Sequence, residues 1–284
     1  MNKIINCKEI VAKIKDEVRE EVGGLNTQPH LVVIIVGEDK ASQTYVANKH
    51  KVCEETGIKS TIVRLPENTT QDELETTINT LSTDNDVHGI LLQLPLPKHL
   101  NDQKAIELIP SYKDVDGLTV ANQGLLAVGD LKNAVIPCTP AGVMRILEEN
   151  GNDLNGAEAV VVGRSNLFGK PMAQLLLNAN ATVTMCHSRT KDLRKHTNNS
   201  SIVICAVGRA KMFDSTYISD GATVVDVGIN RDENGKLCGD CHTNDIIENK
   251  QNVDITPVPG GVGILTTSML MKNVIKCYRL QEAK

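Results

Sequence analysis

The chain of 284 residues contains no tryptophan, and its two phenylalanines and four tyrosines leave aromatic residues at only 2%. Proteins that bind single-stranded nucleic acid stack bases on aromatic rings, and proteins that bind duplex DNA present excess positive charge to the phosphates. This chain instead has a formal net charge of -5 at pH 7. The composition therefore argues against a nucleic-acid partner and against binding to an anionic membrane surface.

Long hydrophobic runs are also lacking. No stretch reaches the roughly 18 consecutive apolar residues of a membrane-spanning helix, and residues 1–6 lack the apolar core of a signal peptide. The eight cysteines are scattered through expected strands and helices, which favours reduced thiols over a disulfide framework. We therefore expect a cytoplasmic globular protein with no membrane partner.

One cysteine pair, in Cys238-Gly239-Asp240-Cys241-His242, matches the attachment pattern for c-type haem. Haem attachment requires export, however, and a redox or zinc site would need ligands that no second Cys-x-x-Cys motif supplies. We interpret the segment as a turn after Asn234-Gly235 whose thiols are incidental. No metal site is predicted.

Strand-like and helix-like segments alternate along the chain. The first half predicts strands at 31–36, 60–65 and 89–94 and helices at 42–56 and 71–81, with Gly57 ending the first helix and Thr69 or Thr70 capping the second. The second half predicts a helix at 141–149, strands at 160–162, 181–186, 201–207 and 222–227, and a closing helix at 267–280. The segment 114–140 is expected to be rich in turns. This alternation is typical of an α/β fold with parallel sheets covered by helices on both faces.

The second half also contains a turn suited to a phosphate. Three valines ending at Val162 lead into Gly163, a short polar loop, Gly169 and a helix-forming run, so that backbone N–H groups and the helix dipole can receive an anion. The segment is not a Walker A loop, because five residues separate the glycines and Pro171 stands where a magnesium-binding hydroxyl would be. It also lacks the middle glycine of the usual dinucleotide fingerprint, so an ordinary strand-to-helix turn remains the alternative.

The next expected strand leads into His187-Ser188-Arg189-Thr190, about 24 residues after Gly163. Rossmann units hold the ribose of the dinucleotide near this point, and NAD sites usually place a carboxylate there for the 2′-hydroxyl. Here the segment offers a hydroxyl and a cation, and Arg164 adds a second cation in the first turn. This environment suits a 2′-phosphate and predicts NADP in preference to NAD.

Other motifs carry side chains suited to chemistry. Tyr45 and Lys49 are four residues apart on one predicted helix and share a face. Gln93 lies at the end of a predicted strand, and Asp116 lies in the turn sequence Asp-Val-Asp-Gly. Each of these residues, taken alone, fits a structural role better than a catalytic one. The sequence Thr-Pro-Val-Pro-Gly-Gly-Val-Gly at 256–263 forms a loop that needs the backbone freedom of glycine.

Taken together, the motifs follow a known order and spacing. They are Tyr-x-x-x-Lys, Leu-Gln-Leu-Pro-Leu-Pro, Lys-Asp-Val-Asp-Gly, Pro-Cys-Thr-Pro, Gly-Arg-Ser-x-x-x-Gly-x-Pro, His-Ser-Arg-Thr and Thr-Pro-Val-Pro-Gly-Gly-Val-Gly. In this combination the chain closely resembles, from end to end, the bifunctional methylenetetrahydrofolate dehydrogenase/methenyltetrahydrofolate cyclohydrolase family. The resemblance implies NADP-dependent oxidation of 5,10-methylenetetrahydrofolate to 5,10-methenyltetrahydrofolate and hydrolysis of that product to 10-formyltetrahydrofolate, reactions of one-carbon metabolism.

The resemblance also implies an architecture. An N-terminal parallel-sheet α/β catalytic domain would bind folate and span residues 1–140, completed by residues 260–284 as the C-terminal helix returns to it. A Rossmann-type domain at residues 141–259 would bind NADP, with the folate cleft between the two domains. The enzyme would be a homodimer, formed through the Rossmann domain.

Site residues are implied only where this chain matches a family motif. Lys49 corresponds to the catalytic lysine and Tyr45 to its pterin-stacking neighbour. Gln93 corresponds to the glutamine that tunes the lysine, and Asp116 to the aspartate that binds the pterin. The implied folate-binding residues are Tyr45, Leu92, Gln93, Leu94, Asp116, Pro257, Pro259, Gly260, Gly261, Val262 and Gly263. The implied NADP-binding residues are Gly163, Arg164, Ser165, Gly169, Ser188 near the 2′-phosphate, Arg189, and Ile229 near the nicotinamide.

The chain departs from the family pattern in three places. Ile264-Leu265 replaces the usual Pro-Met, Phe168 replaces a valine, and Leu118-Thr119-Val120 replaces a phenylalanine followed by His-Pro. We expect a less rigid folate-side loop without the proline. The departures bear on affinity and on the balance of the two activities, and leave the reaction type unchanged.

Three alternative functions are compatible with parts of the sequence. They are a monofunctional dehydrogenase of the same fold, a non-catalytic NADP-binding regulatory protein, and another Rossmann oxidoreductase such as an amino-acid dehydrogenase. The first two do not require the motif residues Lys49 and Gln93, and the third leaves the Pro-Val-Pro-Gly-Gly loop unexplained.

Overall fold

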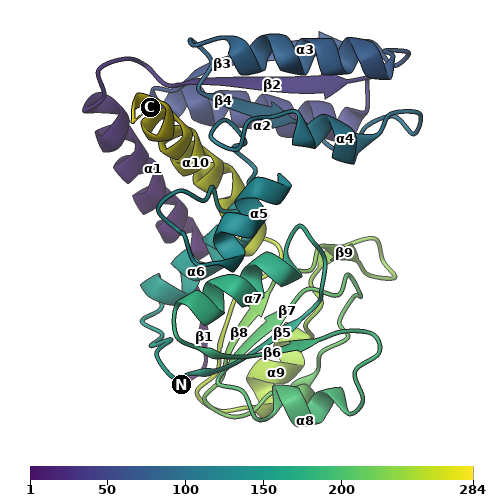
Figure 1. Cartoon of the computed structure of the whole chain (residues 1–284). Helices are drawn as coiled ribbons and strands as arrows, with labels where there is room; N and C mark the ends of the chain where they lie inside the picture. The colour runs from purple at the N-terminus through teal and green to yellow at the C-terminus, as the bar shows by residue number, and fades with distance from the viewer. Residues whose placement is uncertain (284) are drawn as a thin grey trace. The chain divides into compact units, whose positions relative to one another are not determined.

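The computed structural model describes residues 1–283, apart from the side chain of residue 41. The chain divides into two compact units. The six-stranded unit comprises Met1–Ala12 and Thr139–Thr266, and the three-stranded unit comprises Lys13–Cys138 and the chain from Thr267 onward. The chain therefore crosses between the units three times: inside the helix α1 (Cys7–Gly23), at the start of the helix α6 (Cys138–Glu149) and at the start of the helix α10 (Leu265–Glu282) (Figure 1).

The three-stranded unit is built on a parallel sheet with the order β3-β2-β4. The strands are β2 (His30–Val36), β3 (Lys59–Leu65) and β4 (Gly89–Leu92). Every residue of the central β2 is buried, as expected for an apolar run covered on both faces. The predicted strands are confirmed, except that β4 ends two residues early, at Leu92. The Gln93 N–H still donates to Ile34 O on β2, and Pro95, which has no N–H to donate, follows two residues later.

Helices α2 (Lys40–Thr56) and α3 (Gln71–Thr83) cover opposite faces of this sheet (Figure 1). Helix α2 ends at Gly57, which has a left-handed φ of 78°. Helix α3 begins with a capping box, in which Thr70 and Glu73 each accept a hydrogen bond from the other's backbone N–H. Both predicted helices are confirmed, and Thr70 is the capping residue of the two that were predicted.

Three helices with residues in this unit were not predicted from the sequence: the long helix α1 and the short helices α4 (Asp102–Glu107) and α5 (Val120–Ala127). Helix α5 lies inside the segment 114–140, which is therefore less turn-rich than expected. Its N-terminus is capped by Thr119, which accepts a hydrogen bond from the Asn122 backbone N–H at 3.3 Å. The Asn122 side chain is buried and donates to Ser111 O and Asp114 Oδ2, both at 2.9 Å. Tertiary hydrogen bonds thus stabilise a helix whose own residues favour it weakly.

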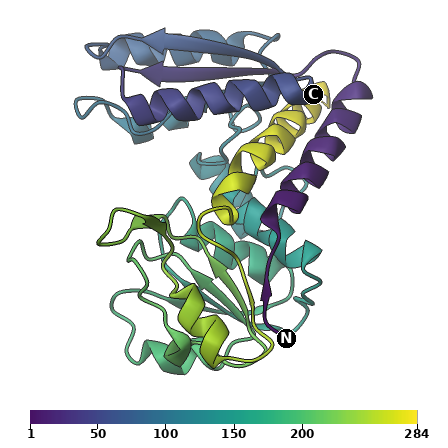
Figure 2. The same cartoon turned by 180° about the vertical axis from the view of Figure 1, so that it is seen from behind.

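The C-terminal helix α10 lies beside the part of α1 that follows Lys13 (Figure 2). Lys272 Nζ lies 2.7 Å from carboxylate oxygens of both Glu17 and Glu21, and Met271 and Val274 are buried. The closing helix therefore packs within the three-stranded unit, as the resemblance implied.

The six-stranded unit contains a parallel sheet with the order β1-β11-β8-β7-β5-β6. Its strands are β1 (Lys3–Ile4), β5 (Glu158–Val162), β6 (Thr182–Cys186), β7 (Ile202–Cys205), β8 (Thr223–Asp226) and β11 (Asp254–Ile255). The chain runs from β5 outward to β6 and then crosses back to β7 on the other side of β5. Ligands of doubly wound folds bind at the carboxyl ends of the strands at such a switch point.

Helix α7 (Gly169–Asn178) lies on one face of this sheet and helix α9 (Thr243–Asn249) on the other (Figure 1). The remaining elements of the unit are α6 (Cys138–Glu149), α8 (Leu193–Thr197) and the antiparallel pair β9 (Asn230–Arg231) and β10 (Leu237–Cys238). The predicted turn at Asn234-Gly235 connects β9 to β10, and Gly235 has a φ of 75°. Among residues 1–283, no helix is long and apolar enough to cross a membrane.

Candidate active site and dinucleotide site

Lys49 and Gln93 form the centre of the candidate active site in the three-stranded unit. Helix α2 carries Lys49, and its Nζ donates a hydrogen bond to Gln93 Oε1 at 2.9 Å. The Gln93 Nε2 donates to Leu94 O at 2.7 Å, which fixes the amide so that its oxygen faces the lysine. Gln93 itself is placed by its backbone N–H, which donates to Ile34 O on β2 at 2.8 Å. The structure thus brings together two predicted site residues that are 44 positions apart.

The segment carrying Asp116 lies beside β4. The Ile90 N–H donates to Lys113 O at 2.8 Å, and Ile90 and Asp114 form an isolated parallel bridge. Asp114 is buried and accepts a hydrogen bond from the Thr119 N–H at 2.9 Å. Gly117 has a φ of 66°, and an added Cβ would lie 2.4 Å from Val135 O. The Asp114 carboxylate therefore stabilises the turn. The Asp116 carboxylate, the other one in the motif, can take part in the candidate site.

Burial raises the pKa of the Asp116 carboxyl group. The nearby Lys49 ammonium acts in the opposite direction, and the Asp114 carboxylate raises the pKa of Asp116 further. The Cys138 thiol lies 3.8 Å from Asp116 Oδ1 and can donate a weak hydrogen bond to it. The arrangement places a carboxyl group of altered acidity within electrostatic range of a lysine, which suits it to binding a polar heterocycle or moving a proton.

Two residues that support Asp116 were not named as site residues from the sequence. Asn273 on α10 donates through Nδ2 to Val115 O and Ile136 O, both at 2.8 Å. The single S–H of Cys138 can donate either to Asp116 or to Val115 O, which lies 3.6 Å away. The Pro-Cys-Thr-Pro motif was a signal for Cys138, but no sequence pattern links Asn273 to Val115, since 158 positions separate them.

The remaining predicted residues of this unit differ in exposure. Tyr45, one turn before Lys49, is 61% exposed, so its ring has a free face on which a planar ligand can stack. Leu92 is buried in the core beneath the sheet edge, and Leu94 packs partly against the same core. Leu92 can therefore contact a ligand through its backbone only.

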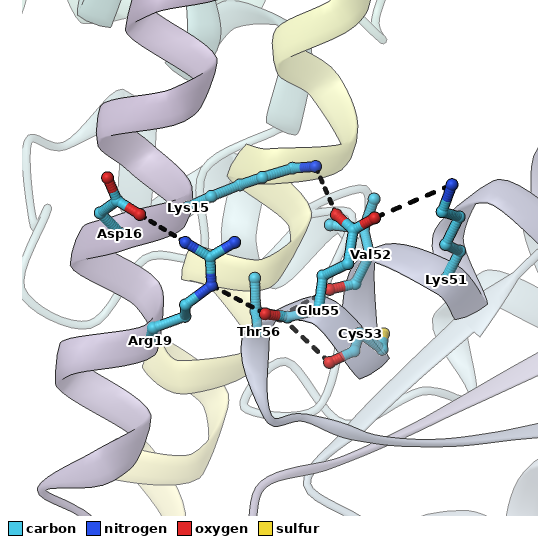
Figure 3. Close-up of polar contacts among 8 residues, drawn as sticks. All are labelled: Lys15, Asp16, Arg19, Lys51, Val52, Cys53, Glu55 and Thr56. Carbon is cyan, nitrogen blue, oxygen red and sulfur yellow. Dashed lines mark hydrogen bonds and ion pairs between the residues drawn. The ribbon is translucent and has the colours of Figure 1, made fainter.

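An ion-pair cluster ties α1 to the C-terminal turn of α2, the helix that carries Lys49 (Figure 3). Lys15 Nζ lies 2.7 Å from Glu55 Oε2, and Arg19 Nε donates to Glu55 O at 2.8 Å. Lys51 is the more distant partner, at 4.0 Å from Glu55 Oε1. The hydrogen bond from Lys15 lowers the pKa of Glu55. The cluster fixes one end of α2, and with it the position of Lys49.

In the six-stranded unit, the predicted phosphate turn connects β5 to α7. Gly163 has a φ of 141°, and an added Cβ would lie 2.4 Å from Ala206 O. A Cβ on Gly169 would lie 2.3 Å from Gly163 O. Ser165 Oγ accepts hydrogen bonds from the N–H groups of Phe168 (3.2 Å) and Gly169 (3.4 Å). Both glycines are thus required by close backbone approach, and the resulting narrow turn at a helix N-terminus fits a dinucleotide phosphate.

The expected 2′-phosphate residues lie at the same edge of the sheet. The Gly163 N–H donates to Cys186 O, the last residue of β6, at 2.9 Å. The segment that follows is a tight turn, in which the His187 N–H donates to Thr190 Oγ1 at 2.9 Å. The side chains of the three predicted contacts, Arg164, Ser188 and Arg189, are all exposed. Arg164, which follows β5, and Ser188 and Arg189, which follow β6, therefore lie at the carboxyl ends of these two neighbouring parallel strands.

A pair of buried aspartates organises the loops that follow β7 and β8. Asp240 is fully buried and accepts hydrogen bonds from the backbone N–H groups of Val207, Gly208 and Arg209 at 2.6, 3.1 and 2.8 Å. Asp226 accepts from the N–H groups of Gly228, Asp240 and Cys241 at 3.0, 2.9 and 2.8 Å. Burial raises the pKa of Asp226 to about 6. In the Cys-Gly-Asp-Cys sequence, Asp240 therefore stabilises the loops at the edge of the sheet where the strands end. The spacing of the two cysteines did not predict this role.

The loop Pro257–Gly263 is shaped by its glycines. Gly260 has a φ of 93°, and a Cβ on Gly261 would lie 2.1 Å from Pro257 O. The Ile264 N–H donates to Gly261 O at 3.2 Å, a hydrogen bond that the family's usual proline at this position could not make. Ile229 is 65% exposed, and its Cδ1 is the nearest neighbour of a Cβ built on Gly263, at 3.5 Å. The loop and Ile229 thus lie side by side.

The other two departures from the family pattern serve the fold. Phe168 is buried where α7 begins. Thr119 caps α5. Across residues 1–283, no group of three histidine, cysteine, aspartate or glutamate side chains could hold a metal ion.

A doubly wound sheet with a phosphate turn, joined to an α/β unit that carries a lysine bonded to a glutamine, defines a two-domain dinucleotide-dependent enzyme. Two family models match the chain: the tetrahydrofolate dehydrogenase/cyclohydrolase catalytic domain over residues 5–116 and the NAD(P)-binding domain of the same family over residues 137–282. The chain belongs to the tetrahydrofolate dehydrogenase/cyclohydrolase family.

Individual relatives agree over nearly the whole chain. The bifunctional protein FolD of Listeria innocua is 48% identical over 282 residues, which are 98% of both chains. The crystal structure of the bifunctional FolD methylenetetrahydrofolate dehydrogenase/cyclohydrolase of Campylobacter jejuni is 46% identical, with a TM-score of 0.93 over 98% of this chain and 99% of that one. The Trypanosoma brucei enzyme, solved with NADP and an inhibitor, is 36% identical, with a TM-score of 0.88 over 97% of each chain.

Proposed function

We propose which residues of this chain carry out each of the two activities of its family. These activities are the NADP-dependent oxidation of 5,10-methylenetetrahydrofolate and the hydrolysis of 5,10-methenyltetrahydrofolate to 10-formyltetrahydrofolate. The catalytic, folate-binding domain, expected at residues 1–140 and 260–284, is the three-stranded unit, which comprises Lys13–Cys138 and the chain from Thr267 onward. The NADP-binding domain, expected at residues 141–259, is the six-stranded unit, which comprises Met1–Ala12 and Thr139–Thr266. The observation that carries the assignment is the hydrogen bond of 2.9 Å between Lys49 Nζ and Gln93 Oε1.

Lys49 acts in the hydrolysis. Adding water to the methenyl group requires a proton to be removed from the water and a proton to reach a folate nitrogen. The lysine can take and return such a proton, while Gln93 holds the side chain through a neutral oxygen and does not fix its charge. A monofunctional dehydrogenase or a regulatory protein would not need this pair.

Binding of the folate is assigned to residues around the pair. The exposed ring of Tyr45 stacks on the pterin, and Asp116 binds the polar edge of the ring through its partly buried carboxyl group. Leu92, Leu94 and the loop residues Pro257, Pro259, Gly260, Gly261, Val262 and Gly263 complete the folate-binding set.

The oxidation depends mainly on alignment, since hydride passes directly between two bound ligands. NADP supplies the hydride acceptor. Gly163, Ser165 and Gly169 form the narrow turn that receives its pyrophosphate at the N-terminus of α7, and Ile229 contacts the nicotinamide. Arg164, Ser188 and Arg189 bind the 2′-phosphate, because two cations and a hydroxyl group suit a phosphate and no carboxylate is present to bind a ribose hydroxyl.

The assembly and the compartment belong to the same proposal. The enzyme is a homodimer formed through the NADP-binding domain. It works in the cytoplasm, where its eight cysteines, all free and buried, stay reduced.

A spectroscopic assay tests the assignment. Purified enzyme is given 5,10-methylenetetrahydrofolate with NADP and, separately, with NAD, and methenyltetrahydrofolate is followed by its absorbance. We expect methenyl absorbance to rise with NADP and then to decay to 10-formyltetrahydrofolate. A rise without enzymatic decay would instead indicate a monofunctional dehydrogenase, and no turnover with either cofactor would indicate a regulatory protein.

A further inference from the structure

Asp240 joins two loops at the carboxyl ends of neighbouring strands in the six-stranded unit. Its side chain is fully buried, and its carboxylate accepts hydrogen bonds from four N–H groups. Three of them are the successive backbone N–H groups of residues 207–209, which follow β7, and the fourth is the side-chain amide of Asn230, which follows β8. Oδ1 by itself accepts from both loops, from the Arg209 N–H and from Asn230 Nδ2, each at 2.8 Å.

The first of these loops also contacts the phosphate turn. The Ala206 N–H donates to Val162 O at 2.9 Å, and a Cβ added to Gly163 would lie 2.4 Å from Ala206 O. The sheet order β8-β7-β5-β6 places the proposed 2′-phosphate contacts, which follow β6, on one side of the phosphate turn and the two loops on the other. A dinucleotide lies across the carboxyl ends of the strands in such folds. Its nicotinamide half therefore extends over the two loops that Asp240 joins.

Ile229, the proposed nicotinamide contact, lies on the second loop. Its side chain is 65% exposed, so its position depends mainly on the backbone on either side. On one side, the Gly228 N–H donates to Asp226 Oδ1 at 3.0 Å, and an added Cβ would lie 2.3 Å from Asp240 Oδ1. On the other side, Asn230 is bonded to Asp240. Both neighbours of Ile229 are thus held against the same buried carboxylate or its partner.

The chemistry at position 240 calls for a carboxylate. Each oxygen of Asp240 accepts two of the four hydrogen bonds, and the group has no donor of its own to satisfy. An asparagine would offer one acceptor oxygen and turn an NH2 group toward two N–H donors. Exchanging one oxygen for nitrogen would therefore release at least one of the loops while leaving the size of the side chain unchanged.

We propose that Asp240 is a positioning residue for hydride transfer, which fixes Ile229 and the loops that support the nicotinamide. The inference rests on the proposed contact between Ile229 and the nicotinamide. Hydride transfer depends on the alignment of two ligands, and a displacement of about 1 Å can slow such a reaction roughly 100-fold. The hydrolysis assigned to Lys49 needs no nicotinamide, and the 2′-phosphate contacts follow a different strand. Loss of Asp240 should therefore slow the oxidation selectively.

The variant Asp240→Asn of the full-length enzyme tests this. Three quantities are measured on one folded preparation: kcat for NADP-dependent oxidation, the dissociation constant of NADP by calorimetry, and the rate of methenyltetrahydrofolate hydrolysis. We expect kcat for the oxidation to fall by at least about tenfold, while the other two quantities stay within about threefold of the parent. A residue that only supported the fold would change all three together.

Asp245→Asn is the matched control within the same unit. The Asp245 carboxylate accepts hydrogen bonds from the Ser215 N–H at 2.6 Å and from Asn249 Nδ2 at 2.9 Å, away from the two loops. This variant should keep all three quantities at parental values. If Asp240→Asn fails to fold, Asn230→Ala decides the question, because it removes only the bond to the second loop. It should lower kcat for the oxidation by at least about threefold, without a comparable change in hydrolysis or NADP binding.

Parental oxidation rates in the folded variants would overturn the proposal. A parallel loss of oxidation, hydrolysis and NADP binding would overturn it as well, because Asp240 would then only stabilise the fold. Failure of the proposed function would look different: the parent enzyme itself would not oxidise 5,10-methylenetetrahydrofolate with NADP.

Discussion

The Lys49 ammonium is bonded to an amide oxygen, that of Gln93 at 2.9 Å, and not to a carboxylate. The amide is in turn oriented by its own hydrogen bond to Leu94 O at 2.7 Å. A carboxylate partner would form an ion pair and stabilise the charged lysine strongly. A neutral partner positions the amine and leaves its proton available, which is what a hydrolytic step at the one-carbon unit requires.

Replacing Lys49 should separate the two activities. Lys49→Met keeps the length of the apolar stem and removes the amine, so cyclohydrolase activity should fall by at least about 100-fold, the lower range for loss of a general acid-base group. NADP-dependent oxidation should remain measurable, so methenyltetrahydrofolate accumulates in the absorbance assay. Lys40→Met, at an exposed lysine where the same helix begins, should retain both activities. Hydrolysis at near the parental rate by a folded Lys49→Met variant would remove Lys49 from the mechanism.

Asp116→Ala should impair both reactions together, because both use the same bound pterin. Loss of hydrogen bonds from a charged group typically costs about 1.5–3 kcal/mol, which corresponds to roughly 10- to 160-fold in kcat/KM. The measurement is kcat/KM for the methylene and the methenyl substrates with the same variant preparation. A selective loss of one activity would contradict a shared binding role for Asp116.

Cofactor preference should depend on Arg164. The parent enzyme is expected to favour NADP over NAD by at least about tenfold in kcat/KM, since one charge-assisted contact to the 2′-phosphate contributes roughly 1.5–3 kcal/mol. Arg164→Ala should reduce this ratio mainly by weakening NADP, whereas Lys195→Ala should leave it unchanged. Equal use of the two cofactors by the parent enzyme would refute the assignment of the 2′-phosphate contacts.

The free energy of unfolding should depend on pH through Asp226, because the pKa of this residue is raised to about 6 from an ordinary value of 3.8. The native state holds this proton more tightly than the unfolded state does. Its contribution to stability is therefore fully present below about pH 4 and is lost as the pH rises through about 6, by on the order of 2–3 kcal/mol.

The check on Asp226 is urea unfolding at a series of pH values, with Asp226→Asn as the variant that cannot titrate. The free energy of unfolding of the parent, minus that of the variant, should decrease between about pH 4 and pH 7. A difference that stays constant over this range would show that Asp226 titrates alike in the folded and unfolded chain.

Chelation should leave both activities intact, since neither hydride transfer to NADP nor the proton chemistry assigned to Lys49 uses a metal. Activity is measured after extended treatment with EDTA and after removal of the chelator, with a zinc-dependent enzyme treated in parallel. A loss that added zinc restores would reveal a metal site, and Cys238, Cys241 and His242 would be the first residues to test.

Local sequence patterns by themselves determined much of the secondary structure of this protein. The apolar run at 31–36, the Gly57 stop and the Thr70 cap report on structure within a few residues of themselves, and each was found where expected. Tyr45 and Lys49 share a helical face by spacing alone. The order of the motifs along the chain further identified the family and its reactions.

Tertiary structure decided which of these residues meet and what holds them. Asn273 supports the Asp116 segment from 158 positions away, and β1 completes its sheet by pairing with β11 near the opposite end of the chain. Asp240 looked like a spacer between two cysteines until its carboxylate was seen to accept three backbone N–H groups. Such roles depend on which hydrogen-bonding partner the folded backbone brings close to a side chain. Local propensity and residue spacing cannot predict that partner, because it lies far away in the sequence.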